Sequence, residues 1–189
     1  MDTNDITVLI GSPGTGKSFL AAAYAVSGLR SGEYDSIVVL RGITEAGRSR
    51  LGFLPGTSDE KTKPFMRPVT DALTKIGFEP DDKQTIECLS VGFIQGLTFD
   101  NAVVICDESQ TLTEDEIKLV IGRLGKRSKL ILTGDPRQDV GNVMGGLRRL
   151  VETCDNLRGL AIHRFEDCDI VRHGIIAKVF ERMERSAND

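Results

Sequence analysis

The chain has 189 residues and a formal net charge of −4, with 40% hydrophobic and 28% charged residues. This composition is typical of a single globular domain that buries an adequate core without disulfides or structural metals. The negative balance excludes a polycation that coats nucleic acid with its whole surface, so any nucleic-acid site must be a local patch.

Short apolar runs alternate with segments of helical periodicity along the chain. Strands are predicted at residues 6–10, 36–40, 102–106, 129–133 and 160–165, and helices at about 17–30, 68–76, 113–124, 145–153 and 171–185. Thr113, followed three residues later by Glu116, forms a capping box that predicts where the third helix begins. The strand segments are almost continuously apolar, which is typical of parallel strands buried on both faces. This order predicts an α/β fold, a mostly parallel sheet with helices on both faces.

An unusually long insert separates the second of these strands from the third. It covers residues 42–101, which is far more than a single crossover requires. Within it, residues 85–90 (TIECLS) are a candidate short strand. We therefore expect one domain over residues 1–189 that carries an insert at about 42–101.

The segment after the first strand has the spacing of a phosphate-binding loop, or P-loop. Its glycines allow the backbone N–H groups to wrap phosphates, and the following helix adds a partial positive charge beneath them. We expect Lys17 to reach the β- and γ-phosphates and Ser18 to bind Mg²⁺. The residues expected to contact the nucleotide are Gly11, Ser12, Pro13, Gly14, Thr15, Gly16, Lys17, Ser18 and Phe19.

Two adjacent carboxylates, Asp107 and Glu108, follow the strand predicted at 102–106. In open α/β sheets, ligands bind at the carboxyl ends of the strands, which is where this pair is expected to lie. Asp107 is predicted to hold the Mg²⁺ ion, and Glu108 to polarise the attacking water as general base. A glutamate beside the metal-binding aspartate favours hydrolysis over phosphoryl transfer to a second substrate.

The next strand ends in LTGDPRQ, at residues 132–138. The side chains of Thr133, Asp135 and Gln138 are expected to emerge near the γ-phosphate, because they follow a buried strand of the same sheet. Gln110, two residues beyond Glu108, is a second candidate for sensing the γ-phosphate or placing the water. Gln110 and Gln138 are therefore predicted γ-phosphate sensors.

Several segments together resemble the PhoH-like family of P-loop ATPases, from about residue 6 to residue 180. They are GSPGTGKS, RLGFLPG, KTKPFMRPVTDAL, VVICDESQ, LTGDPRQD and DIVRHGI. The D-E-x-Q and G-D-x-x-Q elements also resemble the core of superfamily 1 helicases. The resemblance implies a RecA-like core, hydrolysis of ATP, a ring-shaped oligomer (a hexamer), and a link to RNA or single-stranded nucleic acid with helicase-like activity.

The chain departs from the family pattern at two places. The Arg-Gly-Arg-Thr stretch usual before the Asp107 strand is Gln95-Gly96-Leu97-Thr98 here, and the usual Arg-Pro after the second strand is Arg41-Gly42. The two missing arginines weaken the inference of a nucleic-acid contact or an inter-subunit charge at that position.

Hydrolysis by such a core often requires an arginine, from the same chain or a neighbour, that stabilises charge in the transition state. The candidates are Arg123 on the third predicted helix, Arg172 in DIVRH, and Arg41 at the end of the second strand. We expect one of these three to serve the nucleotide.

A local basic segment lies within residues 41–67, which contain six Lys or Arg residues against three acidic ones. Phe53 and Phe65 stand among these charges. Basic residues interleaved with aromatic ones are typical of grooves for single-stranded RNA or DNA. The alternative is that the apolar residues pack the insert onto the core while the charges face solvent.

Three other functions remain open in the sequence. A small-molecule kinase needs a lid that excludes water, and no arginine-rich lid is visible. A GTPase would carry an Asn-Lys-x-Asp motif, which is absent. A non-enzymatic module that binds ATP in order to assemble is the third alternative. No signal-peptide pattern and no apolar stretch of ~20 residues is present, so a cytoplasmic protein without a membrane partner is expected.

Overall fold

Six parallel strands form the centre of the part of the chain that the computed structural model describes, residues 3–42, 69, 71–78, 85–138 and 145–171. The strands are β1 (Ile6–Ile10), β2 (Ser36–Arg41), β3 (Thr85–Ser90), β4 (Ala102–Asp107), β5 (Lys129–Gly134) and β6 (Leu160–Arg164). Their order is β3-β2-β4-β5-β1-β6, and every neighbouring pair is parallel. β5 therefore lies between β1, which leads into the P-loop, and β4, which ends at Asp107.

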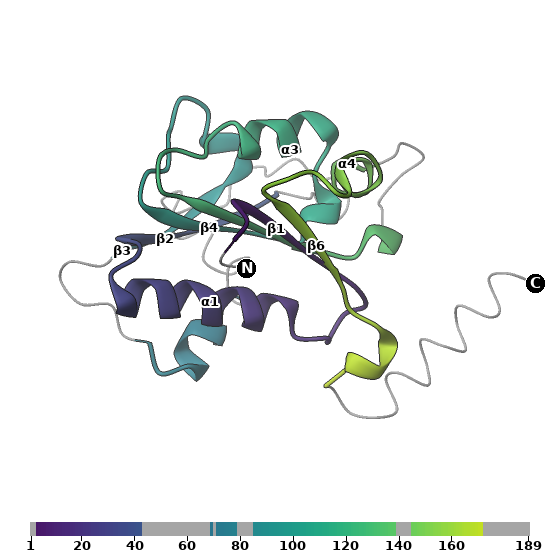
Figure 1. Ribbon diagram of the computed structural model, residues 1–189, viewed down its shortest axis with the longest axis horizontal. Helices are drawn as coiled ribbons and strands as arrows, with labels where there is room; N and C mark the ends of the chain where they lie inside the picture. The colour runs from purple at the N-terminus through teal and green to yellow at the C-terminus, as the bar shows by residue number, and fades with distance from the viewer. Residues whose placement is uncertain (1–2, 43–68, 70, 79–84, 139–144, 172–189) are drawn as a thin grey trace, which may run out of the picture.

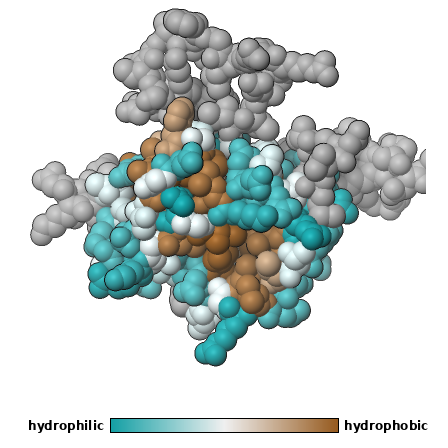
Figure 2. All heavy atoms as spheres, turned by 90° about the horizontal axis from the view of Figure 1, so that it is seen from above, coloured by the Kyte–Doolittle hydropathy of each residue, from teal (hydrophilic) through white to brown (hydrophobic). Residues whose placement is uncertain are grey.

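Helices cover both faces of this sheet, as predicted (Figure 1). One face carries α1 (Lys17–Ser31), and residues 71–75 of the insert form a helical turn that packs beside it. The other face carries α3 (Glu114–Ile121) and α4 (Gly146–Cys154). Figure 2 looks onto this second face, where hydrophobic and hydrophilic residues lie side by side. The α/β fold with helices on both faces is confirmed.

The core consists of two layers, because successive side chains of a strand point to opposite faces. Val8 and Val104 pack beneath α3 and α4, whereas Leu9 and Ile105 pack beneath α1. Burial on both faces explains why these strands are almost continuously apolar in the sequence. Cys106 is fully buried, which raises the pKa of its thiol to about 12 and makes it an inert core residue.

The predicted elements agree with the observed ones to within a few residues at their ends. The candidate strand at 85–90 is present as β3 at the edge of the sheet. The third helix is shorter than predicted, because Gly122 ends it and residues 123–125 turn back toward the segment before β4. The helix predicted at 171–185 and nearly all of the basic segment at 41–67 lie outside the described residues. No helix in the described ranges is both long and apolar enough to cross a bilayer.

The capping box at the start of α3 is confirmed. The backbone N–H of Thr113 donates to Glu116 Oε2 at 2.8 Å, and Thr113 Oγ1 accepts from the Glu116 N–H at 3.3 Å. Removing this cap by Thr113→Ala is expected to lower the free energy of unfolding by about 1 kcal/mol. Urea denaturation followed by circular dichroism measures the change. Thr153→Ala, on the exposed side of α4, is the control and should change stability by less than about 0.5 kcal/mol.

Candidate nucleotide-binding site

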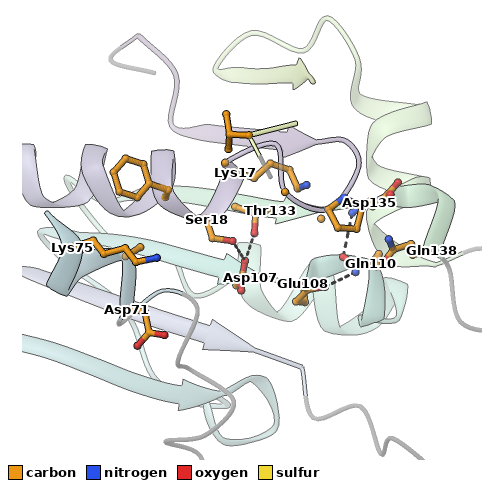
Figure 3. Close-up of a pocket in the computed structure, with 17 residues that line it drawn as sticks. Lys17, Ser18, Asp71, Lys75, Asp107, Glu108, Gln110, Thr133, Asp135 and Gln138 are labelled. Carbon is orange, nitrogen blue, oxygen red and sulfur yellow. Dashed lines mark hydrogen bonds between the residues drawn. The ribbon is translucent and has the colours of Figure 1, made fainter. Parts of the chain in front are cut away.

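A cleft of about 480 Å³ opens at the carboxyl edge of the sheet, where β1, β4 and β5 end. Figure 3 shows polar side chains from the ends of β4 and β5 and from the start of α1 pointing toward one another across it. The sequence-predicted residues that line the cleft are Pro13, Gly14, Gly16, Lys17, Ser18, Phe19, Asp107, Glu108, Gln110, Thr133, Asp135 and Gln138. Residues far apart in the sequence thus meet at one edge of the sheet.

The P-loop backbone adopts a conformation that favours glycine. Gly14 and Gly16 have φ values of 90° and 86°, in the left-handed region. Ser12 and Thr15 are buried behind the loop, and Thr15 Oγ1 donates to the Ser12 carbonyl at 2.9 Å. A Cβ atom at Gly11 would lie 2.8 Å from the backbone oxygen of Phe165. Gly11, Ser12 and Thr15 thus support the loop from behind, and the other residues of the loop line the cleft.

The beginning of α1 lacks the groups that normally neutralise a helix N-terminus. It has no side-chain cap and no acidic residue in its first turn. α3, by contrast, begins with a capping box and three acidic residues in its first turn. The first N–H groups of α1 and its partial positive charge are therefore left for an anion in the cleft.

The side chain of Lys17 is held along the P-loop by hydrogen bonds to backbone carbonyls of the loop. Its ammonium donates to the carbonyls of Gly11 at 2.7 Å and Ser12 at 2.8 Å. Burial lowers the pKa of Lys17, and the nearby carboxylates of Asp135 and Glu108 act in the opposite direction. The result is a cation fixed at the mouth of the loop, where the phosphates of a nucleotide would lie.

Asp107 gathers two hydroxyl groups around a buried carboxylate. Its Oδ1 accepts from Ser18 Oγ at 2.8 Å and from Thr133 Oγ1 at 2.5 Å (Figure 3). Both donors are neutral, and Asp107 is only 3% exposed. A hard oxygen set with one carboxylate is what Mg²⁺ uses when substrate phosphates and water complete its coordination. The residues therefore fit Mg²⁺, and Ser18 and Asp107 would hold it.

Glu108 and Gln110 form an oriented pair beside this site. Gln110 Nε2 donates to Glu108 Oε2 at 2.6 Å, and Gln110 Oε1 accepts from the Asp135 N–H at 3.3 Å. Glu108 has a φ of 55°, an uncommon conformation for a residue with a side chain. A Cβ atom at Gly134 would lie 2.6 Å from Gln110 Oε1, so any larger residue there would displace the Gln110 side chain. The surroundings thus fix the direction of the Glu108 carboxylate.

A sequence model of PhoH, described as PhoH-like protein, matches residues 1–184 of the chain. The chain belongs to the PhoH family. A PhoH-like protein of Synechocystis sp. is 39% identical over 98% of this chain and 58% of its own length. A PhoH-like protein of Bacillus subtilis is 38% identical over 98% of this chain and 60% of its own length. This PhoH-family chain therefore spans about three-fifths of the length of these relatives.

Two solved structures share this fold. The large terminase of a thermophilic bacteriophage, solved with ADP, has a TM-score of 0.63 at 15% identity and covers 96% of this chain and 45% of its own. The N-terminal domain of the DNA packaging ATPase of bacteriophage phi29 has a TM-score of 0.53 at 11% identity, over 87% and 92%. At such identities the likeness shows the fold, and the RecA-like P-loop fold predicted for this PhoH-family chain is confirmed.

The three candidate arginines are not brought together at the cleft. Arg123 donates to the Leu97 carbonyl at 3.3 Å. This contact lies near the amino end of β4, whereas Asp107 lies at its carboxyl end. The sequence placed Arg123 on the third helix, but α3 ends at Ile121 before reaching it, and α3 runs away from the cleft. Arg41 ends β2 in register with Asp107, yet it is not among the residues that line the cleft. Arg172 lies outside the described residues.

Sequence reasoning missed three charged residues of this PhoH-family site. Asp71 and Lys75 line the cleft from the helical turn of the insert. Their spacing of four residues, which places both on one helix face, was the available signal. Arg137 lies within the G-D-x-x-Q element that the sequence singled out. Its guanidinium pairs with Asp135 at 3.2 Å and also donates to Ser12 Oγ.

Proposed function

We propose that this PhoH-family protein binds ATP together with Mg²⁺ and hydrolyses the ATP. The observation that carries the proposal is the position of Glu108. Its carboxylate lines the same cleft as Lys17 and the Ser18–Asp107 pair, and Gln110 holds its direction. A base held beside a phosphate site suits the activation of water.

Each polar group has a role in this proposal. Lys17 and the first N–H groups of α1 bind the phosphate chain, and a bound Mg²⁺ ion would neutralise the charge of the β- and γ-phosphates. Glu108 takes a proton from the attacking water, which is thereby made nucleophilic. Gln110 and Gln138 contact the γ-phosphate and distinguish ATP from ADP. Family membership supports ATP, rather than GTP, as the nucleotide.

The proposal extends to a ring-shaped oligomer, a hexamer, in the cytoplasm. Among the described residues that line the cleft, none is an arginine. An arginine supplied by a neighbouring subunit would stabilise the transition-state charge, as happens where GTPases receive one from an activating partner. In a ring, the neighbouring subunit would cover this open cleft and supply the missing arginine.

Single-stranded RNA or DNA is the partner we propose for this ring. The basic residues of segment 41–67, with Phe53 and Phe65 among them, support this part of the proposal. Hydrolysis coupled to a nucleic acid would make the protein a helicase-like remodeller.

Phosphate release from ATP tests these proposals directly. The chain is incubated with ATP and Mg²⁺, with and without single-stranded RNA or DNA, and with EDTA as the control for the metal. We expect turnover that EDTA abolishes and that a polynucleotide increases. Turnover indifferent to polynucleotide would redirect the search for partners to proteins. Binding of ATP without any turnover would contradict hydrolysis and favour the non-enzymatic assembly module.

A further inference from the structure

Arg137 joins the loop after β5 to the P-loop. Its Nε donates to Asp135 Oδ1 at 3.2 Å, and its Nη2 donates to the hydroxyl of Ser12. Asp135 and Ser12 are both buried, and they belong to two segments more than a hundred residues apart in the sequence. A planar guanidinium with several fixed donors can satisfy both partners at once, which a lysine ammonium on a flexible stem cannot do with the same geometry.

The contacts of Arg137 continue toward the proposed base. The Asp135 N–H donates to Gln110 Oε1, and Gln110 Nε2 donates to Glu108 Oε2 (Figure 3). Each hydrogen bond along this path has an N–H group as donor and an oxygen atom as acceptor. The position of the Glu108 carboxylate is therefore linked through Asp135 to the guanidinium of Arg137.

The same contacts continue from the P-loop toward the segment after β6. Ser12 Oγ donates to Asp167 Oδ1 at 2.5 Å. A second contact joins the Val171 N–H to the Gly14 carbonyl at 3.0 Å. The P-loop is thus fastened on one side to the β5 loop and on the other to residues 167–171.

We propose that Arg137 is a positioning residue that aligns Glu108 and Gln110 with the phosphates held by the P-loop. This inference rests on the proposed ATPase function. Arg137 does not line the nucleotide cleft; it lines a second cavity on the other side of the loop, beside Arg148 and Asp167. It therefore acts through Asp135 and Ser12, and its effect falls on the γ-phosphate end of the site.

The alternative interpretation is an ordinary surface ion pair, which contributes little to stability. The chain offers a matched comparison. Arg137 is 52% exposed, whereas Arg148, paired with Glu152, is 54% exposed. The ion pair of Arg148 joins it to a residue of its own helix. Because Arg137 and Arg148 are about equally exposed but contact different parts of the chain, comparing their variants distinguishes a positioning role from an ordinary surface charge.

The experiment compares Arg137→Ala, Arg137→Lys, Ser12→Ala and the Arg137→Ala/Ser12→Ala double variant with Arg148→Ala as the control. The measurements are kcat, KM and the dissociation constants of ADP and of a non-hydrolysable ATP analogue, with thermal unfolding to verify folding. Ser12→Ala removes the acceptor and leaves Arg137 in place, so it keeps the test valid if Arg137→Ala does not fold.

We expect Arg137→Ala to lower kcat on the order of ten- to a hundredfold, as misplaced catalytic groups do. Its ADP affinity should remain within about twofold of the parent, while its preference for the ATP analogue over ADP falls. Arg137→Lys should stay impaired, and the double variant should lose less than the sum of the two single variants, because each of them removes the contact between Arg137 and Ser12.

Two results would overturn the inference. One is an Arg137→Ala variant that matches Arg148→Ala in kcat and in the preference for the ATP analogue. The other is an equal loss of affinity for ADP and for the analogue, which a merely structural role in the P-loop would produce. If the parent chain shows no turnover, the proposed hydrolysis fails, and the ratio of the two affinities still decides the role of Arg137.

Discussion

Glu108→Gln is expected to reduce ATP turnover by roughly a hundredfold or more, the usual range for removal of a general base. Glutamine has nearly the same shape but cannot take a proton from water at neutral pH. Its side-chain oxygen can still accept from Gln110 Nε2, so the local arrangement should persist. Nucleotide affinity should therefore stay close to that of the parent. Steady-state phosphate release and a direct binding measurement with ATP and Mg²⁺ test the two parts separately.

Glu152→Gln is the matched control for this variant. Glu152 is an exposed glutamate on α4 that pairs with Arg148. It should hydrolyse ATP at the parental rate. If Glu108→Gln also does so, Glu108 is not the base, and the water must be activated by another group of the cleft.

Lys17→Ala is expected to abolish measurable nucleotide binding, which is an effect of a different kind. Lys17 is the cation held at the mouth of the P-loop, and hydrogen bonds to charged groups contribute about 1.5–3 kcal/mol each. Losing two such bonds to phosphate would weaken ATP binding on the order of a hundredfold or more. Isothermal titration with ATP and with ADP, at the same Mg²⁺ concentration, measures the loss.

Lys118→Ala provides the comparison for charge removal alone. Lys118 is exposed on α3 and pairs with Glu114 at 2.7 Å, away from the cleft. Its ATP affinity should equal that of the parent. A Lys17→Ala variant that is folded and still binds ATP with parental affinity would contradict the role given to the P-loop lysine.

The sequence was sufficient for those parts of the site that depend on local pattern. The P-loop and the Asp107–Glu108 pair lie directly at strand ends, and parallel strands bring their carboxyl ends to one edge. The apolar continuity of β1, β4 and β5 reports burial on both faces. Both the motifs and the apolar runs consist of residues that are adjacent in the sequence, so they can be recognised without the structure.

The remaining parts depend on tertiary placement. Arg137 stands in a recognised motif, but its connection to Ser12 exists only because β5 lies next to β1. Arg123 lies within the helix predicted at 113–124, yet the direction of that helix carries the residue to the opposite edge of the sheet from the cleft. The hydrophobic periodicity of the sequence encodes neither the hydrogen-bond partner of Arg137 nor the end of the sheet at which Arg123 lies.

If the chain binds a nucleotide as proposed, the uncapped start of α1 links the stability of the fold to that ligand. A bound phosphate chain would satisfy N–H groups that no side chain of the first turn serves. Anything that binds only the folded state stabilises it, by about 2.7 kcal/mol when the ligand is at a hundred times its dissociation constant. Removing the nucleotide would then leave these N–H groups to water and lower the free energy of unfolding of the chain.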